Sequence, residues 1–210
     1  MKRKAFTLAE VLITLGVIGI VAALTMPALV ANYQKKVLVT RMQKINAIWA
    51  TAGSVLEAEG LGQDRSMLTT NYSLDEIEEW WNVNFAEQIK TVNTKKLSRG
   101  LTVAFPDGSG AFFYNYAPSA GMTVYHIWCV NAKDCMDMDD SSLSTLGNGK
   151  TIFPGGLTGR AYRSASDEGG VITREYLVEN CAANPSTRDS NCAALIKYDG
   201  WEIKDDYPWF

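Results

Sequence analysis

The chain has 210 residues, 47% of them hydrophobic and 20% charged, so it can bury a core and is not disordered throughout. Its length fits one ordinary domain with an appendage and argues against two large domains. The formal net charge of −3 leaves no general basic surface for phosphates, so we expect no nucleic-acid binding by the isolated domain. The single histidine, His126, argues against His-based catalytic triads and multi-His metal sites.

The chain begins with a short basic stretch followed by a long apolar run. Lys2, Arg3 and Lys4 carry three positive charges, and no charged residue occurs from 11 to 34. The 20 residues from 11 to 30 would span about 30 Å as a helix, which is the thickness of a bilayer core. We therefore expect a single membrane-spanning helix, with a cytoplasmic N-terminus and the remainder of the chain extracytoplasmic.

A secretory signal peptide is the alternative interpretation of this segment, since it also combines a basic start with an apolar core. The apolar run is longer than most signal-peptide cores, and Leu29-Val30-Ala31 is a poor cleavage site. Glu10 also lies at the start of the apolar run, where a carboxylate near a bilayer is costly. Such an acid indicates a specific role rather than a simple export signal.

The residues around this acid are Lys4-Ala5-Phe6-Thr7-Leu8-Ala9-Glu10. Together with the apolar run they resemble the class III signal of type IV pilins and type II secretion pseudopilins. The resemblance implies that a prepilin peptidase cuts between Ala5 and Phe6 and that the new amine of Phe6 is N-methylated. Residues 1–5 would then be a leader peptide. Ala5 stands where the family usually has Gly, and Ala9 stands where Ile is commoner.

The same resemblance implies that residues 6–34 form the helix through which subunits assemble into a filament. In that interpretation Glu10 pairs with the Phe6 amine of a neighbouring subunit, so that each charge offsets the cost of burying the other. An ordinary interfacial acid is the alternative for Glu10. Gly16 and Gly19 allow close helix approach or local unwinding, and Pro27 matches a family position where proline bends the helix. Simple tolerance of Gly and Pro in membrane helices is an equal alternative for these three.

Beyond the apolar run, residues 35–210 are expected to form an extracytoplasmic domain that begins with more helix. Its apolar stripe recurs at intervals of three and four residues, comprising Leu38, Met42, Ile45, Ile48, Trp49, Ala52, Val55 and Leu56. A capping box at Ser73-Leu74-Asp75-Glu76 predicts a second helix reaching about Lys90. Its apolar face comprises Ile77, Trp80, Trp81, Phe85 and Ile89. We interpret Trp80 and Trp81 as core residues, with a sugar-binding platform as the alternative.

From Leu101 the hydrophobic period changes to two, which predicts strands. Leu101–Phe105 and Ala111–Tyr116 read as a hairpin around Asp107-Gly108, and Met122–Val130 reads as a third strand. Tyr176–Val178 or Ala193–Tyr198 could add others. The sum is an α+β, pilin-like fold, in which a long N-terminal helix packs on a small antiparallel sheet. His126, in the middle of a strand, is expected to be structural.

The four cysteines are Cys129, Cys135, Cys181 and Cys192, and their spacing differs from the C-x2-C pairs of zinc modules. An extracytoplasmic location favours disulfides, and four cysteines allow three pairings. We expect Cys129–Cys135 and Cys181–Cys192, because each pair closes a short polar loop. The second pair also resembles the disulfide-bounded loop near the carboxyl end of many pilins. Free buried thiols are the alternative.

Four aspartates lie close together beside Cys135, namely Asp134, Asp137, Asp139 and Asp140. Oxygen-rich loops can hold Ca²⁺, and some pseudopilins do so, but the spacing is not that of an EF-hand. A solvated acidic loop is the preferred interpretation, so we expect no cofactor, with Ca²⁺ as the weaker alternative.

No triad, carboxylate pair or nucleotide loop emerges from the sequence, so we expect a non-enzyme. The resemblance implies a prepilin-like structural subunit of the inner membrane that assembles into a surface or periplasmic filament. The implied partners are a prepilin peptidase, identical or related pilin subunits, an inner-membrane assembly platform and the lipid bilayer. A pilus, a secretion pseudopilus and a DNA-uptake system share this signal and stay open. The alternative is a single-span, membrane-anchored binding protein that does not polymerise, with a pocket near Trp80 and Trp81.

Overall fold

The computed structural model describes residues 7–58, 77–98, 100–116, 123–139, 147–154, 172–186 and 190–210. The expected cleavage site at Ala5 and Phe6, the capping box at 73–76 and Asp140 lie outside these residues. Two compact units make up the chain, Met1–Val37 and Leu38–Phe210. The first contains the N-terminal part of helix α1 (Leu8–Ala58), and the second contains the rest of that helix and all the other elements.

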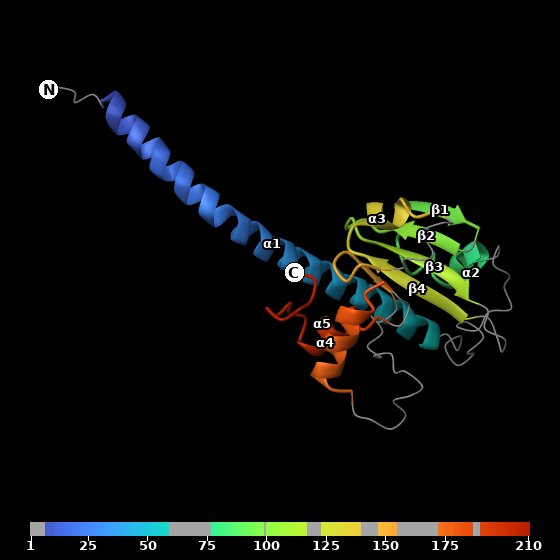
Figure 1. Cartoon of the computed structure of the whole chain (residues 1–210). Helices are drawn as coiled ribbons and strands as arrows, with labels where there is room; N and C mark the ends of the chain where they lie inside the picture. Colours follow the sequence, from blue (N-terminus) through green and yellow to red (C-terminus); the bar gives the residue numbers. More distant parts are fainter. Residues whose placement is uncertain are drawn as a thin grey trace. The chain divides into compact units, whose positions relative to one another are not determined.

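The second unit is built on a five-stranded antiparallel sheet in the order β1-β2-β3-β4-β5 (Figure 1). The strands are β1 (Asn93–Leu97), β2 (Gly100–Ala104), β3 (Gly110–Tyr116), β4 (Thr123–Cys129) and β5 (Ile152–Pro154). The three strands expected from the alternating pattern are therefore confirmed, as is the antiparallel pairing. The turn at Asp107-Gly108 joins β2 to β3, and Gly108 adopts a positive φ of 81°, which favours glycine.

Both edge strands were absent from the sequence-based expectation. β1 reads Asn-Thr-Lys-Lys-Leu and exposes all but its last residue, so it carries no alternating apolar signal. β5 has three residues and ends at Pro154, inside a stretch rich in glycine. Short, charged or proline-ended strands are typical of sheet edges, where they hinder pairing with other chains. The central strands are the ones that an apolar pattern can reveal.

Two hydrophobic cores lie on opposite faces of the sheet. One face packs against the second half of α1, and it includes Phe113 and Trp128. The other face carries Phe112 and Ile127 under the short helix α3 (Ala132–Met136). The alternation along β3 and β4 explains this division, because neighbouring residues in a strand point to opposite faces.

The second helix, α2 (Ile77–Asn84), ends earlier than expected. At its end the Asn84 side chain donates a 2.7 Å hydrogen bond to the Trp80 carbonyl, and the chain continues in turns. Phe85 and Ile89, which the sequence had placed on the helix, are still buried from these turns. The apolar spacing therefore predicted correctly which residues are buried, but it overestimated the length of the helix.

The strands suggested at Tyr176–Val178 and Ala193–Tyr198 were wrong, since both segments are helical. They belong to α4 (Arg174–Ala183) and α5 (Cys192–Tyr198). Thr173 caps α4 by accepting a hydrogen bond from the Tyr176 amide at 3.3 Å. Alanines in both helices favour helix formation. In α5 the five consecutive residues from Cys192 to Ile196 are buried, so burial along it does not alternate as it would in a half-exposed strand.

Candidate functional site

The amino-terminal end of α1 is a capping box formed by Thr7 and Glu10. The Glu10 carboxylate accepts hydrogen bonds from the Thr7 amide and the Thr7 hydroxyl, both at 2.9 Å. In return the Thr7 hydroxyl accepts one from the Glu10 amide at 3.3 Å. A Thr-x-x-Glu box satisfies donors that a helix start otherwise leaves unpaired. The acid singled out in the sequence is thus also the structural start of the helix, a local signal that our sequence analysis missed.

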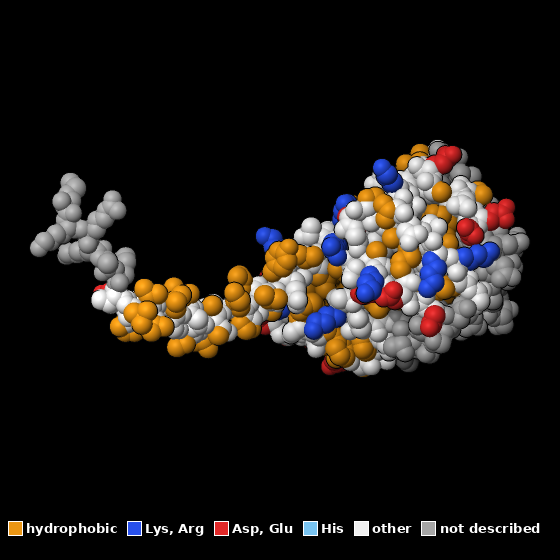
Figure 2. All heavy atoms as spheres, turned by 90° about the horizontal axis from the view of Figure 1, so that it is seen from above, with side chains coloured by type: hydrophobic (Ala, Val, Ile, Leu, Met, Phe, Trp, Pro, Cys, Tyr) orange, Lys and Arg blue, Asp and Glu red, His pale blue; other side chains and the backbone are white. Residues whose placement is uncertain are grey.

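The apolar segment that follows exposes its side chains in every direction. Leu8 is 80% exposed, Ile18 63% and Leu29 70%. Figure 2 shows hydrophobic side chains along the visible side of this segment. A helix that is apolar all around its surface is suited to a lipid phase or to burial among other helices. By length and composition it could cross a membrane, and it is the one such helix among the residues that the structure describes.

The polar and small residues of this segment are compatible with an apolar environment. Thr14 and Thr25 donate their hydroxyls to the carbonyls of Val11 and Val21, at 3.0 and 2.9 Å, so these groups need no outside partner. A Cβ added at Gly16 or Gly19 would meet nothing within 4 Å. In the part of the chain that the structure describes, these glycines therefore leave open surface for an approaching helix.

Pro27 lies inside α1, and the helix continues beyond it. Proline lacks an amide hydrogen, so one backbone hydrogen bond of the helix is missing at this position. The expectation that the segment stays helical overall is confirmed.

The second half of α1 packs on the sheet with the predicted stripe. Leu38, Met42, Ile45 and Ala52 are buried, and Ile48 and Trp49 are partly buried against the same core. The Leu56 side chain lies outside the described part of the chain. Trp49 stacks on Phe85, with ring centroids 4.7 Å apart, and it also contacts Phe113, His126 and Trp128. This half of the helix is therefore a core element of the second unit.

Two basic residues beside the stripe attach α1 to the sheet. Arg41 Nη1 donates to the Val130 carbonyl at 2.8 Å, just after β4. Lys44 Nζ lies 3.6 Å from Asp107 Oδ2 in the turn between β2 and β3. Burial raises the pKa of the Asp107 carboxyl, but hydrogen bonds from Ser109 and the charge of Lys44 lower it more, so the pKa falls below its usual value. Both contacts help to set the register of the helix on the sheet.

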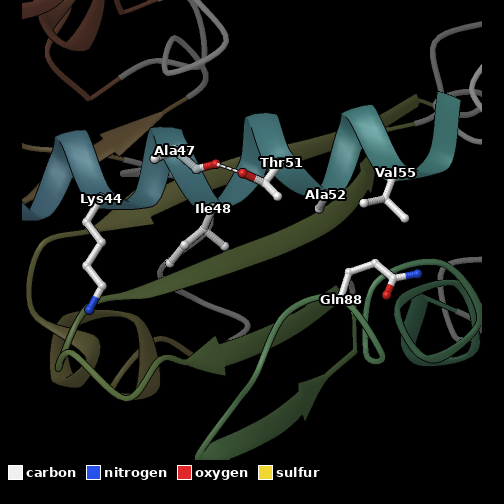
Figure 3. A pocket seen from close by; sticks show the side chains of 7 residues that line it. All are labelled: Lys44, Ala47, Ile48, Thr51, Ala52, Val55 and Gln88. Carbon is white, nitrogen blue, oxygen red and sulfur yellow. Dashed lines mark hydrogen bonds between the residues drawn. The ribbon is translucent and has the colours of Figure 1, made fainter. Parts of the chain in front are cut away.

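Trp80 and Trp81 are core residues, as preferred in the sequence analysis, since each is 1% exposed. A groove of about 500 Å³ lies along the flank of the second half of α1 (Figure 3). It is lined by Lys44, Ala47, Ile48, Thr51, Ala52, Val55 and Gln88. Neither tryptophan lines it, so the aromatic platform considered as a ligand site does not form there.

His126 lies between Trp49 and Trp128, with ring centroids 5.8 and 5.2 Å away. Its Nε2 atom is buried without a hydrogen-bond partner. Burial lowers the pKa of His126 to about 4, because the charged imidazole would lose its hydration there. The aromatic surroundings fit the structural role expected for this residue.

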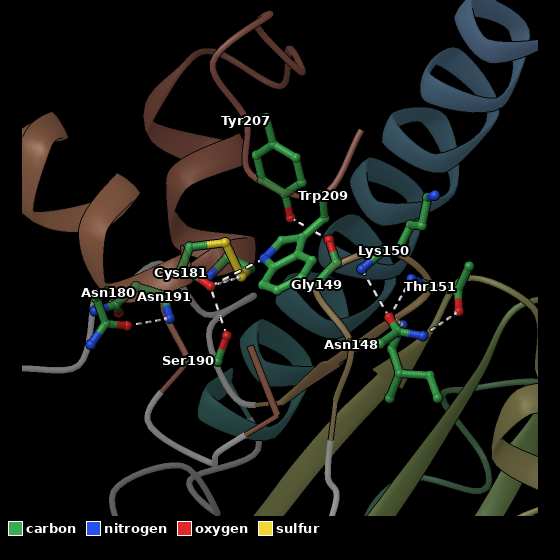
Figure 4. The surroundings of a disulfide bond; sticks show 12 residues. Asn148, Gly149, Lys150, Thr151, Asn180, Cys181, Ser190, Asn191, Tyr207 and Trp209 are labelled. Carbon is green, nitrogen blue, oxygen red and sulfur yellow. Dashed lines mark hydrogen bonds between the residues drawn. A yellow bond between two sulfur atoms is a disulfide. The ribbon is translucent and has the colours of Figure 1, made fainter. Parts of the chain in front are cut away.

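Both expected disulfides are present, Cys129–Cys135 and Cys181–Cys192. The second one joins α4 to α5 under the C-terminal residues (Figure 4). Trp209 donates its indole N–H to the Cys181 carbonyl at 3.1 Å, and Tyr207 donates its hydroxyl to the Gly149 carbonyl. Arg174 holds the same region through ion pairs with Asp199 and Asp206, at 2.7 and 2.6 Å.

The acidic loop beside Cys135 has a different neighbour from the one considered in the sequence analysis. Among the described residues, Asp134, Asp137 and Asp139 belong to no cluster of three or more side chains placed to hold a metal. Instead the ammonium of Lys95, from the edge strand β1, donates to the carbonyls of Met136 and Met138. A cation of the chain itself therefore contacts this loop.

Comparison with known protein families identified a motif in the N-terminal segment. Residues 1–26 match the family model described as the prokaryotic N-terminal methylation motif. A search of curated proteins and a search of solved structures each found no match. The matched segment contains the capping box of Thr7 and Glu10 and most of the exposed apolar helix. The chain therefore carries the prepilin-type signal of type IV pilins and pseudopilins at its amino terminus.

Proposed function

We propose that this protein is the precursor of a filament subunit, matured by a prepilin peptidase and assembled through its apolar helix into a type IV pilus or a type II secretion pseudopilus. One observation carries the proposal. The methylation motif includes the start of a helix whose large apolar side chains are exposed on all sides in the isolated chain. Such a surface needs lipid first and other apolar helices afterwards.

In this proposal the protein begins as a single-pass protein of the inner membrane. Lys2, Arg3 and Lys4 keep the N-terminus cytoplasmic by the positive-inside bias, and the second unit lies outside the cytoplasm. The two disulfides support that location, since such bonds persist in oxidising compartments. Cleavage between Ala5 and Phe6 then removes all three of these positive charges and leaves the apolar helix with a single new amine.

Glu10 has two successive tasks in the proposed cycle. In the single subunit its carboxylate caps the helix together with Thr7. In the filament it pairs with the N-methylated amine of Phe6 in a neighbouring subunit, because a buried carboxylate and a buried amine each lower the cost of the other. Gly16, Gly19 and Pro27 serve helix packing and bending in the same segment.

The amino terminus of the mature protein tests the processing step directly. The full-length chain is produced in a bacterial membrane with and without a prepilin peptidase and analysed by intact-mass and N-terminal peptide mass spectrometry. We expect N-methylphenylalanine at position 6 only when the peptidase is present. An Ala5→Gly variant, which supplies the residue usual in the family, is the positive control for the same bond.

Two results would contradict the proposal. A mature chain that starts near Asn32 would mean that a signal peptidase removes the helix, as in a secreted protein. A chain that keeps residues 1–5 while the Ala5→Gly variant is cut would mean that the native signal is not a substrate.

A further inference from the structure

The face of the sheet that lies opposite α1 is crossed by a strap, residues 131–138, which contains α3. The strap starts just after Cys129 at the end of β4. Ala132 passes over Gly110 of β3 so closely that a Cβ on that glycine would lie 3.1 Å from the Ala132 Cα. Met136 places its sulfur 3.6 Å from the Thr102 hydroxyl of β2. The strap thus contacts three neighbouring strands in succession and covers the second core.

The strap is fastened covalently near its middle. Cys135 forms a disulfide with Cys129 of β4, and both cysteines are fully buried. The backbone adds a 2.7 Å hydrogen bond from the Ala132 amide to the Gly108 carbonyl. The hydrogen bond holds the beginning of the strap to the turn before β3, and the disulfide holds Cys135 to the end of β4.

The second end is fastened by Lys95 of the edge strand β1. Its Nζ donates to the Met136 carbonyl at 2.9 Å and to the Met138 carbonyl at 2.8 Å. Met136 is the last residue of α3, and Met138 lies two residues beyond it. Carbonyls at the C-terminal end of a helix lack intrahelical partners, and a cation is favoured there. The strand register explains the reach, because Lys95, Thr102 and Phe112 are cross-strand partners in one row across β1, β2 and β3. Lys95 therefore lies on the strap's side of the sheet.

We propose that Lys95 is a positioning residue for oxidative folding, which orders the strap and holds Cys135 against Cys129 before their disulfide forms. In the reduced chain the covalent fastener is absent, and the strap has five residues of helix, too few to be stable alone. Two charge-assisted hydrogen bonds at its far end restrict where it can lie. Restricting the strap raises the effective concentration of one thiol at the other.

The chemistry is ordinary thiol–disulfide exchange with a disulfide as the oxidant, which is glutathione disulfide in the test below. The thiolate of one cysteine attacks glutathione disulfide and forms a mixed disulfide, releasing one glutathione. The second thiolate then displaces the other glutathione and closes the Cys129–Cys135 bond. Two protein thiols are oxidised and one glutathione disulfide is reduced to two glutathione molecules. The second step depends on the effective concentration of the thiols, and that is the quantity Lys95 raises.

The neighbouring lysine provides a matched control. Lys96 is also exposed on β1, but its Nζ lies 3.9 Å from Glu78, and both side chains are about half exposed. Exposed pairs of that kind contribute little. The second disulfide, Cys181–Cys192, provides an internal control in the same molecule, because α4 and α5 hold it and Lys95 does not contact it.

The experiment measures both disulfides separately in the full-length chain in detergent micelles. Wild type, Lys95→Met, Lys95→Arg and Lys96→Met are equilibrated in glutathione buffers of graded redox ratio, trapped with iodoacetamide and digested. Mass spectrometry of the peptides then gives the equilibrium constant of each disulfide. Methionine keeps most of the lysine stem and removes the ammonium, whereas arginine keeps donors.

We expect Lys95→Met to lower the equilibrium constant of Cys129–Cys135 about tenfold, the size expected for charge-assisted hydrogen bonds. Cys181–Cys192 should change less than twofold in the same sample, Lys96→Met should match wild type, and Lys95→Arg should recover part of the loss. Equal loss at both disulfides would overturn the proposal, since it would indicate a general loss of stability. An unchanged Cys129–Cys135 constant in Lys95→Met would overturn it as well, because the strap would then be ordered without the ammonium.

Discussion

The two halves of α1 belong to one helix but face different surroundings. From Leu8 to Tyr33 its large apolar side chains are exposed, and the hydrogen bonds described there stay within the segment, as at Thr7 and Glu10. From Leu38 onward one stripe is buried against the sheet, and Arg41 and Lys44 reach strands and turns of the second unit. Among the described residues, the half from Leu38 onward is packed on the sheet, whereas the large apolar side chains of the first half are packed on nothing. The proposed bilayer and filament would cover that exposed surface.

The largest effect is expected for the substitution Glu10→Ala, which tests the assembly role of the exposed half of α1. The variant still carries the whole apolar run, so membrane insertion should be unchanged, but we expect filament assembly to fall below detection because the Phe6 amine has no carboxylate to meet. Membrane fractionation and electron microscopy of sheared filaments measure the two properties. Thr14→Ala, which removes a hydroxyl bonded only within its own helix, is the control and should assemble. Normal filaments from Glu10→Ala would remove the pairing role.

Substituting one isoleucine in each half of α1 compares how much each half contributes to the free energy of unfolding. Ile45 is 1% exposed in the second half, so Ile45→Ala should lower the free energy of unfolding of the second unit by about 4 kcal/mol. Ile18, in the first half, is exposed, and Ile18→Ala should leave that free energy unchanged within about 0.5 kcal/mol. Urea unfolding in detergent, followed by tryptophan fluorescence, measures both. Equal losses of unfolding free energy in the two variants would contradict the assignment of Ile45 to the core and of Ile18 to an exposed surface.

The pH dependence of stability tests whether His126 is buried beside Trp49 in the packed half of α1. His126 has a pKa of about 4 in the folded chain, against 6.5 when unfolded, so the unfolded state binds the proton first. Stability should therefore be complete above pH 6.5 and fall as the pH approaches 4, by up to about 3 kcal/mol. The same unfolding assay at a series of pH values measures this.

His126→Phe, which keeps an aromatic ring and cannot titrate, should lose most of the slope between pH 6.5 and 4. Burial raises the pKa of Asp199, but the hydrogen bonds and charges of Arg174 and Lys204 together lower it below its usual value, and hydrogen bonds from Arg174 lower the pKa of Asp206. Their contribution is lost only below about pH 4. A slope that persists in His126→Phe would assign the effect to other groups.

The smallest expected effect concerns the two basic contacts of the second half. Arg41→Ala leaves the Val130 carbonyl without its 2.8 Å charged donor and should cost about 1.5 kcal/mol. Lys44→Ala removes a longer contact from a side chain that is 56% exposed, and it should cost less than about 1 kcal/mol. Unfolding midpoints at low and high salt measure both. A larger loss for Lys44→Ala would reverse the assignment of Arg41 as the main attachment.

Sequence reasoning succeeded where a pattern is local and repeated. The apolar run, the methylation motif, the stripe from Leu38 to Val55 and the alternation in β2, β3 and β4 are all short-range signals. The disulfide pairing was also predicted, because each pair closes a short loop. These features account for the membrane-competent helix and for the central sheet.

Elements whose structure depends on tertiary contacts could not be predicted from the sequence. β1 is polar and becomes a strand because a tight connection pairs it with β2, and α5 is buried on nearly all sides, so neither has a periodic face. The contact of Lys95 with Met136 and Met138 joins residues 41 and 43 positions apart, and no spacing in the sequence indicates it. The Thr7 and Glu10 box could have been found, since Thr-x-x-Glu before an apolar run is a recognisable helix start.

That capping box has a consequence for the reserve of unassembled protein. A carboxylate that enters a nonpolar medium with two donors already attached is cheaper to keep there than a bare one. In the proposed cycle, this lowers the cost for a newly made subunit of remaining in the lipid before it meets a partner. In that cycle, synthesis of the subunit need not keep pace with its assembly into filaments.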